Sequence, residues 1–139
     1  TVITRAQEPF LNTVHLKDCR HMNAVGAILP AKAEFHQDVF ERADLIVVDD
    51  LENAQRGSRE LREHFGASSK EWSGVKVLSD LLAANAGCPL GTRFSIFKGM
   101  GMGLSDLAMA SVVYELACQR DLGISLPRQT RENLLLTQV

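Results

Sequence analysis

The sequence predicts an α/β fold built on a parallel β-sheet. Short apolar runs alternate along the chain with segments whose apolar residues follow a helical period, which is the pattern of a parallel sheet with connecting helices. The apolar runs are continuous rather than alternating, as is typical of strands covered on both faces. The chain has 139 residues, of which 45% are hydrophobic and 23% charged. This is the composition of a globular protein that can bury a core within one domain.

Four apolar runs are the candidate strands. Residues 45–48 form the cleanest one, because four consecutive aliphatic residues run directly into Asp49 and Asp50. Two more strands are expected over residues 22–28 and 94–97, and a fourth over residues 1–4.

The first strong helix is expected between Asp50 and Gly66. Apolar residues recur there at near-helical spacing, and the opposite face is charged, so we interpret that face as solvated. Asp50 is a suitable N-cap and Gly66 a suitable stop. Glu52 and Arg56 stand four residues apart, in the order that favours an ion pair.

The second strong helix is expected over residues 105–120. Ser105 can cap it, and Asp106 falls in its first turn, where the helix dipole favours an anion. The segment is apolar almost all round, which predicts burial between layers or against another domain. From Gly123 onward the mixed sequence is interpreted as an arm that leaves the domain. Shorter helices are expected over residues 37–43 and 78–84.

The charge balance and the length of the apolar runs bear on two classes of partner. With 15 basic and 17 acidic residues the net charge is −2, so we expect no nucleic-acid partner. No apolar run approaches the roughly 20 residues that span a bilayer, and the first residues lack the layout of a signal peptide. We therefore expect no membrane association either.

The cysteines and histidines predict neither disulfides nor a metal site. Cys19, Cys88 and Cys118 are odd in number and widely spaced, which favours a reducing cytoplasm over a disulfide framework. His15, Cys19 and His21 resemble a metal cluster, but nothing nearby supplies a fourth ligand in the usual paired spacing. We interpret them as polar residues around a turn.

Three loops after the predicted strands could carry chemistry, because ligands of parallel sheets bind at the carboxyl ends of the strands. Residues 4–9 are small and polar, although a plain surface turn explains them equally well. In residues 25–30, Gly26 permits the close approach of a flat ring or chain. Residues 98–103 place three glycines before a helix, which suits an anion or, alternatively, tight helix–strand packing. This run is not the dinucleotide fingerprint, since Leu104 takes the place of its third glycine.

The familiar catalytic sets are missing from the sequence. There is no G-x-S-x-G elbow, and no cysteine has an evident histidine partner. The carboxylates near the strand and helix ends are interpreted as caps; they are Asp49, Asp50, Glu52 and Asp106.

Four segments together resemble the ornithine cyclodeaminase/mu-crystallin family. Met22-Asn-Ala-Val-Gly-Ala27, followed by Pro30 and Glu34-Phe35, resembles that family's "inaVGA-x-x-P-x-x-x-E-L" stretch. The other three segments are Ala43-Asp-Leu-Ile-Val-Val-Asp-Asp50 with Glu52-Asn-Ala54, Leu78-Ser-Asp-Leu-Leu82, and Phe97-Lys-Gly-Met-Gly101 followed by Asp106. Their order and spacing agree with the family over residues 1 to about 123.

The resemblance implies the later part of a Rossmann-like domain that binds NAD or NADP. Residues 1–104 would belong to this incomplete domain, and residues 105–139 would lead toward a dimerisation and substrate domain that this chain lacks. The family's chemistry is hydride exchange between nicotinamide and a small amino or imino acid. Its glycine-rich fingerprint, and the Lys and Arg that hold the substrate carboxylate, belong upstream. We therefore expect a fragment that is inactive alone, with its open sheet edge covered by a partner or a second copy, as in a homodimer.

The resemblance also places cofactor contacts at the three strand ends. Thr4, Arg5 and Ala6 would lie near the adenosine or pyrophosphate. Val25, Gly26 and Ala27 would lie near the nicotinamide, so a larger residue at Gly26 should abolish binding. Lys98, Gly99 and Gly101 would close over nicotinamide and substrate.

One departure from the family concerns proton transfer. The family's cyclodeaminases and dehydrogenases carry an Asp after "VGA", which is the acid/base residue of the deaminating members, whereas this chain has Ile28, which cannot transfer a proton. The catalytic residue is therefore unknown, and ornithine cyclisation is doubtful. The leading hypothesis is an NAD(P)-dependent enzyme acting on amino or imino acids. The alternatives are a non-catalytic ligand-binding member of the mu-crystallin type and a structural fragment without ligand affinity.

Overall fold

The structure is a computed structural model, and it describes residues 1–66 and 71–127. The chain divides into two units, Thr1–Gly103 and Leu104–Val139, which we treat separately.

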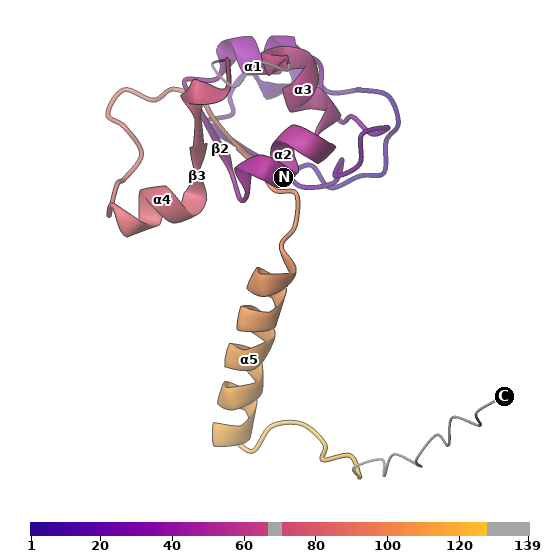
Figure 1. The fold of residues 1–139 in the computed structure, drawn as a ribbon, viewed down its shortest axis with the longest axis vertical. Coiled ribbons are helices and arrows are strands. Elements are labelled where there is room, and N and C mark those ends of the chain that lie inside the picture. Colours follow the sequence, from indigo (N-terminus) through magenta and orange to yellow (C-terminus); the bar gives the residue numbers. More distant parts are fainter. Residues whose placement is uncertain (67–70, 128–139) are drawn as a thin grey trace, which may run out of the picture. The chain divides into compact units, whose positions relative to one another are not determined.

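The first unit contains a four-stranded parallel sheet. Its strands are β1 (His21–Ala24), β2 (Leu45–Val48), β3 (Val75–Val77) and β4 (Ser95–Lys98), in the order β1-β4-β2-β3 (Figure 1). In the register, Lys98 pairs with Ala24 of β1 on one side and with Val48 of β2 on the other. The carboxyl ends of these three strands therefore lie side by side, and the predicted α/β class is confirmed.

One face of the sheet is covered by three helices: α1 (Asp38–Arg42), α2 (Leu51–Gly57) and α3 (Arg59–Phe65). Right-handed crossovers from β1 to β2 and from β2 to β3 run in the same direction across the sheet, which places their helices on one face. The core between them contains Val39, Phe40, Ala54 and Leu61 from the helices and Met22, Ala24, Ile46, Val48 and Ile96 from the strands.

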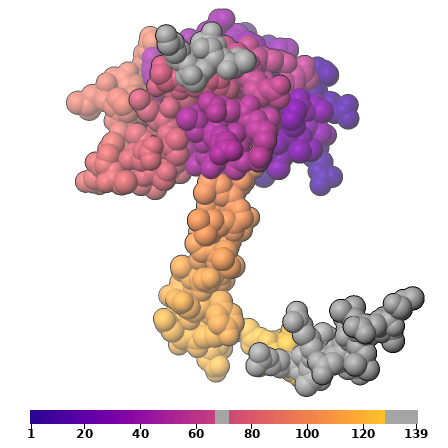
Figure 2. Space-filling view, viewed as in Figure 1, coloured from indigo at the N-terminus to yellow at the C-terminus, as the bar shows by residue number. Residues whose placement is uncertain are grey.

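The other face carries α4 (Leu78–Ala83), because the crossover from β3 back to β4 runs in the opposite direction. Figure 1 shows α4 apart from the other three helices, beyond β3. In Figure 2 the salmon-coloured segment with β3 and α4 lies beside the magenta segment with α2. Leu78, Leu81 and Leu82 of α4 line an apolar hollow of about 530 Å³ with Leu45, Val47 and Phe97 of the sheet. Within the described residues this face is only partly covered, although the strands predict cover on both faces.

The strands differ from the prediction in three places. The expected strand over residues 22–28 ends at Ala24, because the amides of Gly26 and Ala27 bond to a carboxylate and not to a neighbouring strand. Residues 1–4 contribute a single bridge between Val2 and Ala24 rather than a full strand. β3 was not predicted, since three residues with one exposed lysine give almost no apolar signal.

The single helix expected from Asp50 to Gly66 is two helices that meet at Ser58. Asp50 caps α2 by accepting a bond from Asn53 N, and Gly66 ends α3 at φ 68°, as predicted. Ser58, however, leaves the helical conformation at ψ 112° and caps α3 by accepting from Leu61 N. Arg56 donates to Asn53 Oδ1, not to the Glu52 that its spacing suggested.

The remaining short elements are as follows. The helices expected over residues 37–43 and 78–84 are confirmed as α1 and α4. Two 3₁₀ helices that were not expected cover Thr13–Leu16 and Glu71–Gly74.

The helix α5 (Gly103–Gln119) starts two residues earlier than predicted. Ser105 therefore lies within the helix and is not its N-cap, whereas Asp106 does fall in the first turn. Its large apolar side chains are exposed; they include Leu107, Met109, Val112, Val113 and Tyr114. The surface that would bury them stays a prediction, and the end of the expected arm, residues 128–139, lies outside the described residues. Among the helices described here, none has the length and apolar character needed to cross a membrane.

Candidate functional site

The loops that follow β1 and β4 meet at one edge of the sheet. Gly99 N donates to Ala24 O at 3.1 Å, so the glycine-rich loop after β4 begins directly beside the loop after β1. Beyond this contact lies a cavity of about 420 Å³, lined by Ile28, Leu29, Pro30, Asn53, Arg56, Gly57, Met100 and Gly101. A cavity of this size suits a small molecule or one end of a larger one. Its position at the carboxyl ends of parallel strands makes it the candidate site.

The loop after β1 is held by the carboxylate of Glu34, which is fully buried. Glu34 Oε2 accepts from Gly26 N and Ala27 N, each at 3.1 Å, and Glu34 Oε1 accepts from Thr4 N. Three backbone donors thus converge on one carboxylate, which is the compensation a buried charge requires. The bond to Thr4 also ties residues 1–4 to this loop.

Gly26 is required by the protein backbone itself. A Cβ at this position would lie 2.5 Å from Thr4 O, and closer still to Thr4 N and to Glu34 Oε1. The sequence interpretation, in which the missing Cβ admits a flat ring, assigned the close approach to the wrong neighbour. The chain segment that approaches Gly26 is residue 4 of the same protein.

The side chain of Lys98 is fully buried. Its Nζ lies 3.0 Å from Glu60 Oε2 and donates to Ala27 O at 2.8 Å. The prediction that Lys98 closes over nicotinamide and substrate therefore does not apply to its ammonium group, which points into the protein. Any contact of Lys98 with a cofactor would come from its backbone.

Asp49 organises the glycine-rich loop after β4. Its carboxylate accepts from Met100 N at 2.9 Å and from Gly101 N at 2.8 Å, and it also accepts from Asp50 N. As the interpretation of Asp49 as a cap implies, its carboxylate accepts hydrogen bonds from backbone amides, but these amides belong to a loop 51 residues later in the chain. Only the pairing of β2 with β4 brings the two together.

Two glycines, Gly57 and Gly101, line the cavity, and a third, Gly99, packs beside it. Gly101 has φ +85°, which a residue with a side chain adopts only with strain. Gly99 packs closely, since a Cβ there would lie 3.1 Å from Val25 Cγ1. Gly57 at the end of α2 admits Met100, whose Cε would be 2.9 Å from an added Cβ. The break in the helix after Gly57 is thus part of the site.

The other predicted contacts lie at the same edge. Thr4 and Arg5 are exposed, and Arg5 O accepts a bond from Lys32 Nζ at 2.8 Å. Ala6 is partly buried, and its N–H donates to Thr4 Oγ1. The structure therefore gathers Thr4, Val25, Gly26, Ala27, Gly99 and Gly101 around adjoining strand ends. Whether they contact a cofactor stays a prediction.

His15 and His21, two of the three residues whose spacing resembles a metal cluster, make hydrogen bonds within the protein. His15 accepts from Asn12 N in a capping box at the first 3₁₀ helix. His21 Nδ1 lies 2.8 Å from Ser95 Oγ on the sheet. In the described part of the chain, no group of three His, Cys, Asp or Glu residues is arranged to hold a metal ion. Cys19, Cys88 and Cys118 are free and exposed.

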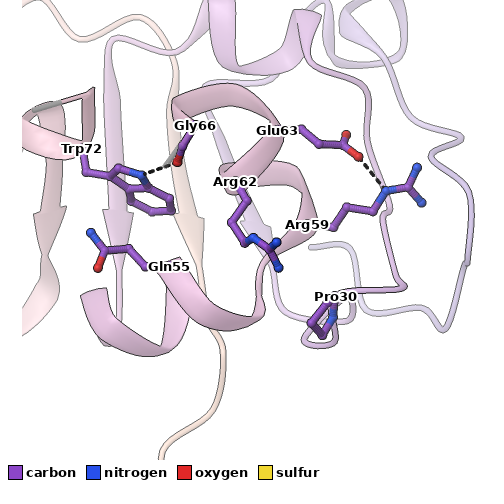
Figure 3. Close-up of a pocket in the computed structure, with 7 residues that line it drawn as sticks. All are labelled: Pro30, Gln55, Arg59, Arg62, Glu63, Gly66 and Trp72. Carbon is purple, nitrogen blue, oxygen red and sulfur yellow. Dashed lines mark hydrogen bonds and ion pairs between the residues drawn. The ribbon is translucent and has the colours of Figure 1, made fainter. Parts of the chain in front are cut away.

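A larger cavity of about 630 Å³ lies along α2 and α3 (Figure 3). It is lined by Pro30, Gln55, Arg59, Arg62, Glu63, Gly66 and Trp72, and none of the predicted cofactor contacts is among them. Arg59 is already engaged there, with Glu63 Oε1 2.7 Å from its Nε. Trp72 Nε1 donates to Gly66 O at 3.1 Å. We place the site at the strand ends and not here.

The shifted acid–base groups lie away from the candidate cavity. Hydrogen bonds from the backbone and side chain of Arg93 lower the pKa of Asp44, at the amino end of β2. Burial lowers the pKa of His64, which stacks on Phe40. Burial alone would raise the pKa of Asp38, but hydrogen bonds from Thr13 and Val39 and the nearby His36 together lower it. None of these groups lines the cavity beside Ile28.

The sequence matches the ornithine cyclodeaminase/mu-crystallin family over residues 1–121. The chain belongs to this family. The family prediction made from the four sequence segments is therefore confirmed.

Two proteins of named activity are similar in sequence to the chain. It is 32% identical to an alanine dehydrogenase from Archaeoglobus fulgidus over 125 residues, which cover 86% of the chain and 37% of that enzyme. It is 29% identical to the ketimine reductase mu-crystallin of Rattus norvegicus, over 81% of the chain and 34% of that protein. The chain thus spans about a third of the length of these relatives.

Solved structures of the family share the fold. An archaeal alanine dehydrogenase dimer with bound NAD matches 90% of the chain and 39% of its own length, with a TM-score of 0.68 and 28% identity. The iminosuccinate reductase of Paracoccus denitrificans, in complex with NAD⁺, matches 86% of the chain and 37% of its own length, with a TM-score of 0.70 and 27% identity. Both solved structures contain NAD, the cofactor that the family resemblance implies.

Proposed function

We propose that this chain is the later part of an NAD(P)-dependent enzyme that exchanges a hydride with a small amino or imino acid. The observation that supports this most directly is the cavity in which Ile28 and Gly101 meet at the carboxyl ends of β1 and β4. Relatives of the same fold bind NAD or reduce imino acids. The chain covers only about a third of those proteins, so the activity is proposed for the whole protein.

The residues around the cavity fit the nicotinamide end of the cofactor. An added Cβ on Gly101 would meet no atom within 4 Å, so this side of the loop is open to a ligand. Ile28, Leu29 and Met100 supply apolar surface against which a ring can stack, beside the polar side chains of Asn53 and Arg56. The cofactor supplies the hydride when bound, and the chain's part is to orient it and keep water away. The groups that bind the pyrophosphate and the substrate carboxylate are proposed to lie in parts of the protein outside this chain.

Residue 28 bears on which of the family's activities we propose. Ile28 is 44% exposed and lines the cavity, where it offers no group that can donate or accept a proton. We therefore propose a reductase or dehydrogenase whose proton comes from another group, and not an ornithine-cyclising lyase. The same observation favours a second candidate, a non-catalytic member that binds NAD(P) or a small ligand.

A homodimer and a cytoplasmic location complete the proposal. The outer edge of β1 pairs only through the bridge at Val2 in the described residues, and such an edge is normally covered. The archaeal relative is a dimer. The cytoplasmic location is supported by three free cysteines.

Titration of the whole protein with NADH or NADPH, followed by fluorescence, tests binding. We expect saturable binding of one of the two. Turnover of NAD(P)H with a panel of cyclic and linear imino acids, and the reverse reaction with amino acids, then separates the two candidates. Binding without turnover would support the non-catalytic member, and the absence of both would refute the proposal.

A further inference from the structure

Three charged side chains are fully buried beneath the loop that carries Ile28. They are Glu34, Glu60 and Lys98, and each has a relative exposure of 0%. Their bonds form one connected network: Lys98 Nζ lies 3.0 Å from Glu60 Oε2, and Glu60 Oε1 accepts from Glu34 N at 2.9 Å. Ser58 Oγ donates to Glu60 Oε2 at 3.3 Å, so both glutamates are well supplied with donors.

This network holds the backbone of Ala27 from both sides. Its N–H donates to Glu34 Oε2 at 3.1 Å, and its carbonyl accepts from Lys98 Nζ at 2.8 Å. The two peptides on either side of the Ala27 Cα are therefore each held by one buried charge: Glu34 holds the Gly26–Ala27 peptide through its N–H, and Lys98 holds the Ala27–Ile28 peptide through its carbonyl. Ile28 is the first residue after this peptide, and its side chain lines the cavity.

We propose that Glu34, Glu60 and Lys98 are positioning residues that set where residue 28 stands against the bound ligand. This inference rests on the proposed function for its ligand, the nicotinamide end of NAD(P), but not for its geometry. The network joins three otherwise separate elements: Glu34 precedes α1, Glu60 belongs to α3 and Lys98 ends β4. The loop after β1 is thereby placed relative to the loop after β4, on the opposite wall of the cavity.

Stability alone is a poor reason for a buried lysine–glutamate pair. Burying two charges costs much of what their attraction returns, so neutral replacements of similar shape often leave a protein as stable as before. A variant that removes both charges can therefore keep the fold and still lose the bond to Ala27 O. This property separates a positioning role from a structural one.

The test is the double variant Glu60→Gln with Lys98→Met in the whole protein. Gln keeps an acceptor for Glu34 N, and Met keeps the volume of the lysine stem without its donor. We expect the double variant to stay folded, with an unfolding temperature above that of Lys98→Met alone, and with amide hydrogen exchange at residues 26–28 of the cofactor-free protein at least about tenfold faster than in the unaltered protein. We expect kcat to fall about tenfold to a hundredfold, while KM for the cofactor changes by less than about threefold.

Two further variants sharpen the result. Lys98→Met alone leaves Glu60 buried without its partner, so it should lower the unfolding temperature as well as kcat. Glu63→Gln removes an exposed ion pair of α3, Arg59 with Glu63, outside the network. It should change neither hydrogen exchange at residues 26–28 nor kcat.

Hydrogen exchange at residues 26–28 that stays unchanged in the stable double variant would overturn the inference, as would faster exchange with an unchanged kcat. A protein that shows no NAD(P)H turnover even without substitutions would instead count against the enzymatic candidate of the proposed function, and one that also binds neither NADH nor NADPH would refute the proposed function as a whole. The exchange measurement, which needs no cofactor, would in that case still decide whether the network holds the loop.

Discussion

Replacing Gly26 with alanine tests how the loop after β1 is packed. The added Cβ would lie 2.5 Å from Thr4 O and nearer still to Thr4 N. Both are backbone atoms, so they cannot rotate away, and the segment bridged at Val2 has to shift as a unit. Overpacking costs about 1–3 kcal/mol, and losing the bond from Thr4 N to the buried Glu34 adds about 1–3 kcal/mol. We expect Gly26→Ala to lower the free energy of unfolding by about 3 kcal/mol.

The assay is equilibrium unfolding of the whole protein in urea, followed by circular dichroism, with Gly74→Ala as the matched control. An added Cβ at Gly74 meets no atom within 4 Å, so this variant should stay within about 1 kcal/mol of the original protein or gain slightly. Titration with NADH or NADPH should show that the Gly26 variant also loses cofactor binding, because the loop moves. Equal stability of the two variants would refute the packing argument, and unchanged affinity would refute the placement of Gly26 in the site.

Three further predictions concern the second loop, the aromatic cluster and the position of the missing acid. Asp49→Ala removes the acceptor for Met100 N and Gly101 N. We expect the free energy of unfolding to fall by about 1–3 kcal/mol and hydrogen exchange at these two amides to become faster. A variant with neither change would contradict the role given to Asp49. Burial lowers the pKa of His64 below its usual value of 6.5, so folding favours the neutral ring, and the free energy of unfolding should fall as the pH drops from about 6.5 toward the lowered pKa. His64→Phe should flatten the pH dependence of urea unfolding between about pH 7 and 5. An unchanged pH dependence would count against this role of His64. Ile28→Asp should change the free energy of unfolding by less than about 1 kcal/mol, because residue 28 is already 44% exposed. The new carboxyl group should give any NAD(P)H turnover a new dependence on pH. A pH profile identical to that of the original protein would show that residue 28 does not reach the reacting atoms.

Local sequence signals predicted those elements that depend on their own residues. The apolar run at Leu45–Val48 is β2, and the cap at Asp50 and the stop at Gly66 bound the helical segment as expected. The break at Ser58 was missed because the apolar period continues through it. At the break, Ser58 is extended and caps α3, and Gly57 lies against Met100, 43 residues later in the chain.

The candidate site was predicted in outline but not in its chemistry. The glycine-containing loops do lie at the same sheet edge, since parallel strands bring their carboxyl ends together whatever the intervening sequence. The sequence does not show how the charged side chains of Glu34, Glu60 and Lys98 are placed. Lys98 was expected at the ligand and is buried, and the network of Glu34 and Glu60 was not foreseen. A glutamate eight residues after a glycine carries no local signal that its carboxylate returns to that glycine's amide.

The sequence by itself determined the α/β class, the positions of most helices and strands, and the membership of the family. These follow from hydrophobic period, capping residues and motif order, which are properties of neighbouring residues. Only the tertiary structure decided why Gly26 must be glycine, where the ammonium group of Lys98 points, and which loop Asp49 holds. Each of these depends on contacts between residues that are 22 to 71 positions apart. Such contacts are set by strand order and burial, and a buried charge takes whichever donors the completed fold brings to it.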